Sequence, residues 1–189
     1  MALIEPVSYM SYIQSNREEV FDPETSAQSA SLVKDVIRLN FPEITAVLPL
    51  EDAGDGMKDL ESQIALLYSV KANKLDGARA PAAVRNFIRE HGFRYGAAVF
   101  ATGFTRDSKE YKKQVAKGAL LGIITAVVSL GAVSYYAMPL KYSSSLYMIV
   151  VDAQEDKIVF YERIQPEEVD PLNAKWLRRR IERFRKHFK

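Results

Sequence analysis

The side chains best suited to catalysis or metal binding are few and far apart in this chain. The sequence has no cysteine and two histidines, His91 and His187. Because zinc sites draw on Cys and His, and thiolate chemistry needs Cys, this composition argues against a zinc centre and excludes disulfides and thiol catalysis. We therefore expect no metal and no cofactor.

An acidic run follows a short apolar stretch and is the next candidate for a cation site. Its carboxylates are those of Glu51, Asp52, Asp55 and Asp59. Their spacing does not fit a calcium-binding loop, whose ligands recur at alternate positions around a fixed glycine. A turn that leads from a strand into a helix, with an aspartate as the helix cap, explains the run better.

The serine and glycine motifs do not predict an enzyme either. The three consecutive serines at 143–145 lack the glycines that frame a nucleophile elbow. Gly54 and Gly56 are not followed by the Gly-Lys-Ser/Thr ending of a phosphate-binding loop. An unrecognised carboxylate-based hydrolase is the third-ranked interpretation, after two non-catalytic ones.

The longest uncharged stretch runs over residues 118–140, between Lys117 and Lys141. About 20 apolar residues suffice to cross a bilayer as a helix. The stretch is rich in small residues, with Gly118 and Gly122 in a spacing that lets helices approach closely, and Pro139 near its end. It is therefore the feature that any account of function must explain.

Three interpretations of this segment stay open. It is a hydrophobic helix or hairpin buried against partner chains, a segment that contacts a membrane, or a core helix within one monomer. A lipid-facing barrel strand is disfavoured, because residues 120–128 do not alternate between polar and apolar. The residues that we expect to make the membrane or self-association contact are Leu120, Leu121, Gly122, Ile123, Ile124, Val127, Val128 and Leu130.

The carboxyl-terminal segment is strongly basic. Residues 175–189 contain eight Lys or Arg and one Glu, a charge of +7, so the rest of the chain carries −5 to give the net +2. A basic amphipathic helix can lie on an anionic membrane, bind nucleic acid, or simply pack its apolar stripe on the domain. The candidate anionic-surface contacts are Arg178, Arg179, Arg183 and Arg185. With no known nucleic-acid motif present, we do not expect nucleic acid as the partner.

The first half of the chain predicts alternating strands and helices. A loose strand pattern covers residues 3–13, and Pro6 weakens it. Asp22 followed by Pro23 is typical of a helix start, and Pro42 ends that helix after residue 40. Residues 44–50 form a short apolar run of strand type. Two amphipathic helices follow, over residues 57–71 and from Pro81 to a carboxyl-terminal glycine, Gly92.

The second half predicts a strand at 95–105, the apolar insertion at 108–142, and a β-hairpin. The hairpin strands are 146–151 and 158–162, joined by a polar turn at 152–157. A last helix begins at Asp170 and Pro171. With 189 residues, this order predicts a single α/β domain spanning residues 1–189, an α/β sandwich with a mixed sheet and helices mainly on one face.

Three stretches resemble the amino-terminal-type domains of curli-secretion-channel and TolB envelope lipoproteins. They are ITAVLPLED at 44–52, HGFRYGAAVFATGFTRD at 91–107 and SSLYMIVVDAQEDKIVFYER at 144–163. Asp156 stands where the hairpin turn of that family usually has Gly, and Phe160 with Tyr161 replaces its usual Trp. The resemblance implies an α/β sandwich at the periplasmic side of a bacterial envelope. It also implies a lipid anchor on a cysteine that would lie upstream of Met1.

Taken together, the sequence predicts a non-catalytic, envelope-associated lipoprotein that self-assembles or binds a partner, with membrane contact through 118–140. Its expected partners are further copies of the chain or another envelope protein. The alternative is a cytoplasmic or inner-membrane-associated binding module that uses the basic carboxyl-terminal helix. No export signal is recognisable in the first residues, MALIEPVSYM, so the compartment stays an expectation.

Overall fold

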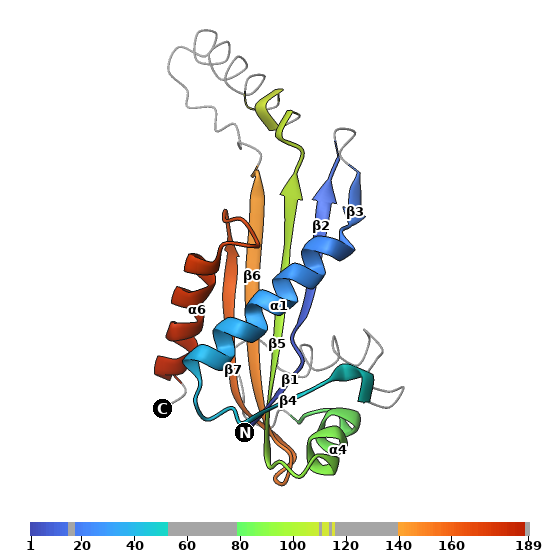
Figure 1. The fold of residues 1–189 in the computed structure, drawn as a ribbon, viewed down its shortest axis with the longest axis vertical. Helices are drawn as coiled ribbons and strands as arrows, with labels where there is room; N and C mark the ends of the chain where they lie inside the picture. The colour runs from blue at the N-terminus through green and yellow to red at the C-terminus, as the bar shows by residue number, and fades with distance from the viewer. Residues whose placement is uncertain (15–17, 53–78, 110, 114, 116–139, 188–189) are drawn as a thin grey trace, which may run out of the picture.

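The computed structural model describes residues 1–14, 18–52, 79–109, 111–113, 115 and 140–187. These residues form a mixed sheet of seven strands with helices packed against it (Figure 1). The predicted α/β class with a mixed sheet is therefore confirmed. The helix predicted at 57–71 and the apolar stretch 118–140 lie outside the described residues.

Three long antiparallel strands form one half of the sheet. They are β5 (Tyr95–Arg106), β6 (Tyr142–Asp152) and β7 (Lys157–Glu167). β5 and β6 pair without a register shift from Tyr95 opposite Asp152 to Thr105 opposite Tyr142. The predicted hairpin is thus confirmed, and its strands extend well beyond the apolar cores at 146–151 and 158–162.

Four shorter strands complete the other half. β1 (Ala2–Ile4) and β2 (Val7–Ile13) both run parallel to β5 along its free edge. β4 (Ala46–Leu48) pairs parallel with β1, and β3 (Glu19–Phe21) pairs antiparallel with β2. The edge opposite β7 is therefore shared by two strands of three residues each.

The strand predicted at the amino terminus is interrupted at Pro6. Leu3 lies opposite Ala97 and Val7 lies opposite Phe100, so four steps along the first strand match three along β5. One residue is therefore extra, as in a β-bulge, and proline suits this place because it has no N–H for the ladder.

Helix α1 (Pro23–Asn40) begins where the sequence predicts. The Asp22 carboxylate accepts a hydrogen bond from the Thr25 backbone N–H at 2.9 Å, and Pro23 takes the first turn. The apolar face of the helix packs on the sheet, since Val33, Val36 and Ile37 are buried.

Helix α6 (Ala174–His187) begins later than predicted. The Asn173 side chain caps it by accepting the Trp176 N–H at 2.9 Å. The Asp170 carboxylate instead accepts the Leu172 N–H at 2.9 Å and so forms a tight turn before the helix. The predicted start at Asp170 and Pro171 is therefore wrong, because Asp170 caps a turn. The apolar stripe of the helix packs on the domain, since Trp176, Leu177, Ile181 and Phe184 are buried.

The helices lie on both faces of the sheet. Helices α1 and α6 cover one face and enclose a core that includes Met148, Val150 and Ile164 (Figure 1). Helix α4 (Ala82–Glu90) covers one end of the other face, where Ile149 and the helix residues share a second core. Two of these three helices thus pack on one face, as the sequence predicts.

Two glycines fix the junction between α4 and β5. Gly92 has φ +78°, a left-handed conformation that suits the predicted glycine at the helix end. A Cβ on Gly96 would come within 2.5 Å of the Ile88 side chain, so glycine lets α4 approach the sheet.

Candidate interaction surfaces

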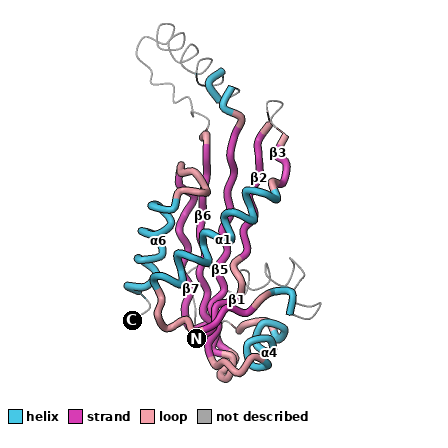
Figure 2. The backbone as a smooth tube through the Cα atoms, viewed as in Figure 1, coloured by secondary structure: helices cyan, strands magenta, loops and turns pink. Residues whose placement is uncertain are grey.

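The end of the sheet where β5 stops and β6 starts gathers positive charge. The strands are still paired at Thr105 and Tyr142, so the chain leaves and re-enters the sheet at neighbouring positions. A helical turn follows β5 directly (Figure 2). We call this end of the sheet, where the chain leaves β5 and enters β6, the neck. Its cations, the neck cations, are Arg106, Lys109, Lys112, Lys113 and Lys141.

Hydrogen bonds hold the two sides of the neck together. The Arg106 Nε–H donates to the Leu140 carbonyl at 3.1 Å, and the Lys141 N–H donates to Glu168 Oε1 at 3.1 Å. On the side of β5, the Asp107 carboxylate accepts the Tyr12 hydroxyl at 3.1 Å and the Lys109 N–H at 2.9 Å. The neck is thus anchored to β2, β5 and the loop before α6.

Two tyrosines stand beside the neck cations. The Lys141 ammonium lies 4.6 Å from the centre of the Tyr142 ring. The pKa of Lys141 is raised, mainly by a side-chain hydrogen bond with Tyr142 and further by the charges of Tyr142, Asp170 and Tyr111. Lys141 therefore stays protonated at physiological pH, and Tyr111 lies near it across the neck.

Helix α6 divides its basic residues between two roles. Arg180 donates to Glu167 at 2.6 Å, and Arg183 forms an ion pair with Glu162 at 2.9 Å, so both tie the helix to β7. Glu167 also accepts the Trp176 indole N–H at 2.9 Å. The remaining cations are exposed and form the α6 basic face, which consists of Lys175, Arg178, Arg179, Arg185 and Lys186.

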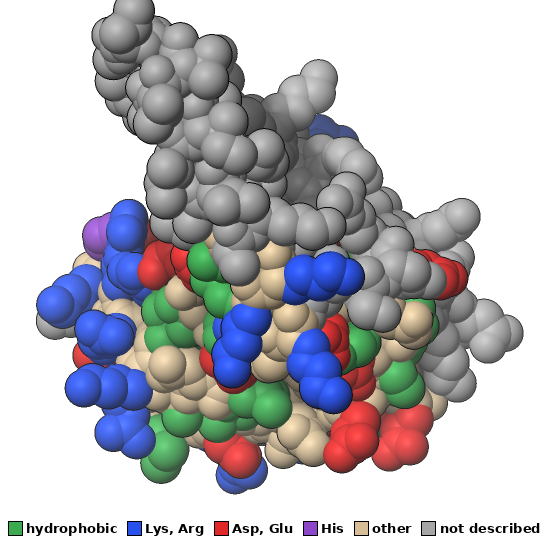
Figure 3. Space-filling model, turned by 90° about the horizontal axis from the view of Figure 1, so that it is seen from above, with side chains coloured by type: hydrophobic (Ala, Val, Ile, Leu, Met, Phe, Trp, Pro, Cys, Tyr) green, Lys and Arg blue, Asp and Glu red, His purple; other side chains and the backbone are tan. Residues whose placement is uncertain are grey.

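The α6 basic face coincides with the basic side of the molecule. Viewed down the long axis, Lys and Arg side chains gather on the side where α6 lies (Figure 3). All four predicted anionic-surface contacts are exposed, and Arg183 is also paired with Glu162, whereas Arg178, Arg179 and Arg185 belong to the α6 basic face. The predicted contact residues between Leu120 and Leu130 lie outside the described residues.

At the opposite end of the sheet, acidic groups pair with arginines. The buried Asp152 carboxylate accepts Arg94 Nε–H at 3.0 Å and an Arg94 Nη–H at 2.8 Å. Asp156, in the β6–β7 turn, has φ 57° and forms ion pairs with Arg85 and Arg89 of α4. These pairs fasten the hairpin turn to α4 and give a structural reason for aspartate at position 156.

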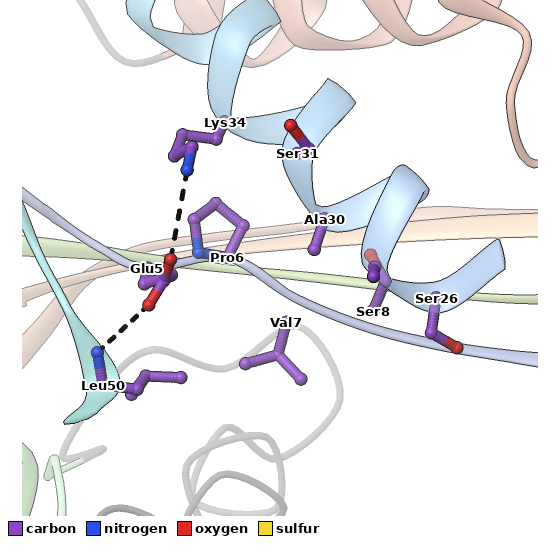
Figure 4. A pocket seen from close by; sticks show the side chains of 10 residues that line it. Glu5, Pro6, Val7, Ser8, Ser26, Ala30, Ser31, Lys34 and Leu50 are labelled. Carbon is purple, nitrogen blue, oxygen red and sulfur yellow. Dashed lines mark hydrogen bonds and ion pairs between the residues drawn. The ribbon is translucent and has the colours of Figure 1, made fainter. Parts of the chain in front are cut away.

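A cavity of about 360 Å³ lies between α1 and the segment that joins β1 to β2 (Figure 4). Glu5 reaches across it, 4.0 Å from the Lys34 ammonium, and accepts the Leu50 N–H at 3.2 Å. Ser26 accepts the Met10 N–H at 2.9 Å, and Ser8 donates to Ser29 at 3.1 Å. Ser8 and Ser26 therefore hold β2 against α1, and Glu5 connects the segment before β2 to α1 and to Leu50.

The side chains considered for catalysis do not come together. His91 lies 2.8 Å from the Phe87 carbonyl at the end of α4, whereas His187 lies 2.8 Å from Glu162 at the end of α6. The serines 143–145 lie within β6 and are buried. In the part of the chain that the structure describes, no three acidic or histidine side chains are grouped so that they could hold a metal ion.

The sequence signal for the neck was the charged stretch between residues 106 and 117, which leads into the apolar segment. Its closeness to Lys141 follows only from the pairing of β5 with β6. None of the helices in the described ranges is both long and apolar enough to cross a membrane. Comparison of the chain with protein-family models, curated proteins and solved structures finds no match.

Proposed function

We propose that this chain is a non-catalytic, envelope-associated protein that self-assembles, or binds a partner or a membrane, through residues 118–140. The observation that carries the proposal is the unbroken pairing of β5 with β6 up to Thr105 and Tyr142. Among the described residues, both cores contain side chains from β5, before the segment, and from β6 and β7, after it, so the chain leaves and re-enters the sheet at one end. An uncharged stretch of this length needs an apolar environment, which a partner or a membrane supplies.

The envelope location rests on the resemblance of three stretches to periplasmic domains, and on the α/β sandwich that this resemblance implies. The chain would then act at the periplasmic side, lipid-anchored in its precursor. A cytoplasmic location is the alternative.

Replacing residues 118–140 by a short Gly/Ser linker tests the proposal. We expect the variant to fold with an unchanged cooperative melting transition, because shortening a loop between paired strands changes the closure entropy only modestly. We also expect it to lose the self-association or detergent dependence of the full chain. Size-exclusion chromatography with light scattering and thermal melts of both proteins measure the two effects.

Two results would contradict the proposal. If the shortened variant unfolds, residues 118–140 belong to the core of the monomer. If it folds but keeps the size and detergent dependence of the full chain, the segment is not the assembly element.

The α6 basic face supports a second candidate, a module that binds an anionic partner through this helix. The observation that favours it is the split of charges, since Arg180 and Arg183 neutralise Glu167 and Glu162 and leave the α6 basic face exposed. On this candidate, Arg178, Arg179 and Arg185 replaced by Gln would weaken binding to anionic vesicles by about a hundredfold, at about fivefold per cation. Vesicle flotation measures it, and a wild-type protein that does not bind at low salt would remove this candidate.

A further inference from the structure

We propose that the neck cations bind the headgroups of anionic phospholipids and so hold the sheet upright on a membrane surface. The inference rests on the proposed function and names the chemical class of its partner. It concerns the described residues at the end of β5 and the start of β6.

The first argument is the local balance of charge. The neck brings Arg106, Lys109, Lys112, Lys113 and Lys141 to one end of the sheet. Among the described residues, the nearby carboxylates are those of Asp107, Glu168 and Asp170, so the five cations outnumber three acids, which accept hydrogen bonds from Tyr12 and from backbone N–H groups. Lys109 and Lys112 are exposed, so the neck presents positive charge to solvent.

The second argument is the order of residue types in two places, where the chain leaves the sheet after β5 and where it returns to the sheet at β6. After β5, the sequence passes through the neck cations and Tyr111 before the uncharged stretch begins at Gly118. From the other side, the exposed Leu140 and then Lys141 precede β6, whose first residue is Tyr142. Cations and tyrosines next to an apolar segment are the residues that membrane–water interfaces favour, because headgroups are anionic and phenol rings are amphipathic.

The third argument separates lipid from nucleic acid as the source of the phosphate. Both present phosphates to lysine, but only a bilayer also accepts an uncharged segment directly beyond the cations. In the sequence, the uncharged segment 118–140 follows the neck residues after β5 and ends directly before Lys141. The observations therefore favour a lipid surface.

The orientation follows from the place of α6. This helix runs beside β7 along the long axis of the sheet, so its basic face looks sideways, whereas the neck is at the end (Figure 1). A flat membrane in contact with the neck therefore leaves most of the α6 basic face in solvent. The two surfaces can be tested against each other with variants of equal charge.

The experiment compares full-length wild type with two triple variants. In the neck variant Lys109, Lys112 and Lys113 become Gln, which keeps the helix propensity of these positions. The matched control is the α6 variant, in which the three exposed residues Arg178, Arg179 and Arg185 become Gln. Flotation is measured with vesicles of phosphatidylcholine alone and of phosphatidylcholine mixed with phosphatidylglycerol, at low and high salt.

We expect wild type to bind the anionic vesicles more tightly, and high salt to reduce this preference. The neck variant should lose about a hundredfold in affinity for them, at about fivefold per cation, and the α6 variant about twofold or less. Circular dichroism should show that both variants are folded.

Other outcomes overturn the inference. A loss in the α6 variant that equals or exceeds the loss in the neck variant would place the anionic contact on α6. Equal binding of wild type to both kinds of vesicle would show that headgroup charge is not recognised, while membrane contact through 118–140 would stand. Tighter binding to duplex DNA than to anionic vesicles would assign the neck to nucleic acid. A wild type that is monomeric and binds neither vesicle would overturn the proposed function as well.

Discussion

Replacement of Ile149 by Lys is expected to leave no folded protein. Ile149 is fully buried in β6, between Ala98 of β5 and Tyr161 of β7. Losing an isoleucine side chain from a core costs about 2–5 kcal/mol, and burying an unpaired ammonium costs several more. Because domains of this size are stable by about 5–15 kcal/mol, the variant should lack a cooperative melting transition and collect in the insoluble fraction.

The matched control is Val159→Lys in the neighbouring strand. Val159 is 44% exposed, so a lysine there can keep its ammonium in water. We expect its free energy of unfolding to change by about 0.5 kcal/mol or less. A soluble Ile149→Lys protein that melts cooperatively would show that residue 149 is not in the core.

Replacement of Asp152 by Ala should cost about 2 kcal/mol at neutral pH, within the range for losing hydrogen bonds to a charged group, because the Arg94 guanidinium left behind is partly solvated. The Asp152 carboxylate is 2% exposed, accepts two hydrogen bonds from Arg94, and accepts the backbone N–H groups of Gln154 and Glu155 at 2.9 and 3.1 Å. Its loss leaves these donors without their acceptor. Chemical denaturation of both proteins at neutral pH measures the difference.

The same carboxylate makes part of this stability depend on pH. The Arg94 hydrogen bonds, with help from the two backbone N–H groups, lower the pKa of Asp152 from 3.8 to about 2. A depressed carboxyl pKa stabilises the folded state above the unfolded-state value, and this stability is lost as the pH falls. About 2 kcal/mol should therefore disappear between about pH 4 and pH 2 in wild type, and this step should be missing in Asp152→Ala.

Glu155→Gln serves as the control for this acid step. Glu155 is exposed and lies 3.6 Å from Lys157 in a surface ion pair, so its removal should change the stability little. If Asp152→Ala unfolds with acid along the same curve as wild type, the Asp152–Arg94 pair does not stabilise the fold.

The sequence predicted the ends of helices correctly where a single residue determines the end through its own chemistry or backbone conformation. Asp22 and Pro23 fix the start of α1, and Gly92 fixes the end of α4, because cap chemistry and left-handed backbone are properties of single residues. Asp170 shows the limit, because an aspartate before a proline can cap a turn as well as a helix. The cap is Asn173, which accepts the Trp176 backbone N–H. The Trp176 indole N–H in turn donates to Glu167 of β7, so the start of α6 depends on a contact with a distant strand.

The lengths of the two hairpin strands were underestimated because periodicity detects only the apolar part of a strand, whereas the strand predicted at 44–50 was too long, since β4 covers only Ala46–Leu48. The serines 143–145 pair with β5 as regularly as the apolar core of β6, since backbone hydrogen bonds do not depend on side-chain type, and the polar end of β7 pairs again at Glu167, opposite Ser144, after a register shift. The break at Pro6 was suggested by the sequence as a weak point. Its nature as a one-residue bulge depends on the register with β5.

The candidate surfaces could be predicted in charge but not in arrangement. Helical spacing marks all the arginines of α6 as off the apolar stripe, yet Arg180 and Arg183 meet acids of β7, and sequence spacing does not show such a meeting. Likewise, Lys141 joins the lysines after β5 only because the two strands pair. Non-local pairing therefore decides which charges remain available to a partner.

The open edge of β7 bears on how copies of this protein could aggregate. In the described part of the chain no strand pairs with its outer side, so the outward-pointing N–H and C=O groups of alternate β7 residues have no strand partner. Such an edge invites addition of a strand from another molecule, as in amyloid-like growth. Here Pro166 removes one ladder N–H, and charges recur along the strand at Lys157, Glu162, Arg163 and Glu167. A second copy added in parallel register would place each of these charges beside its like, so this form of sheet extension along β7 is disfavoured.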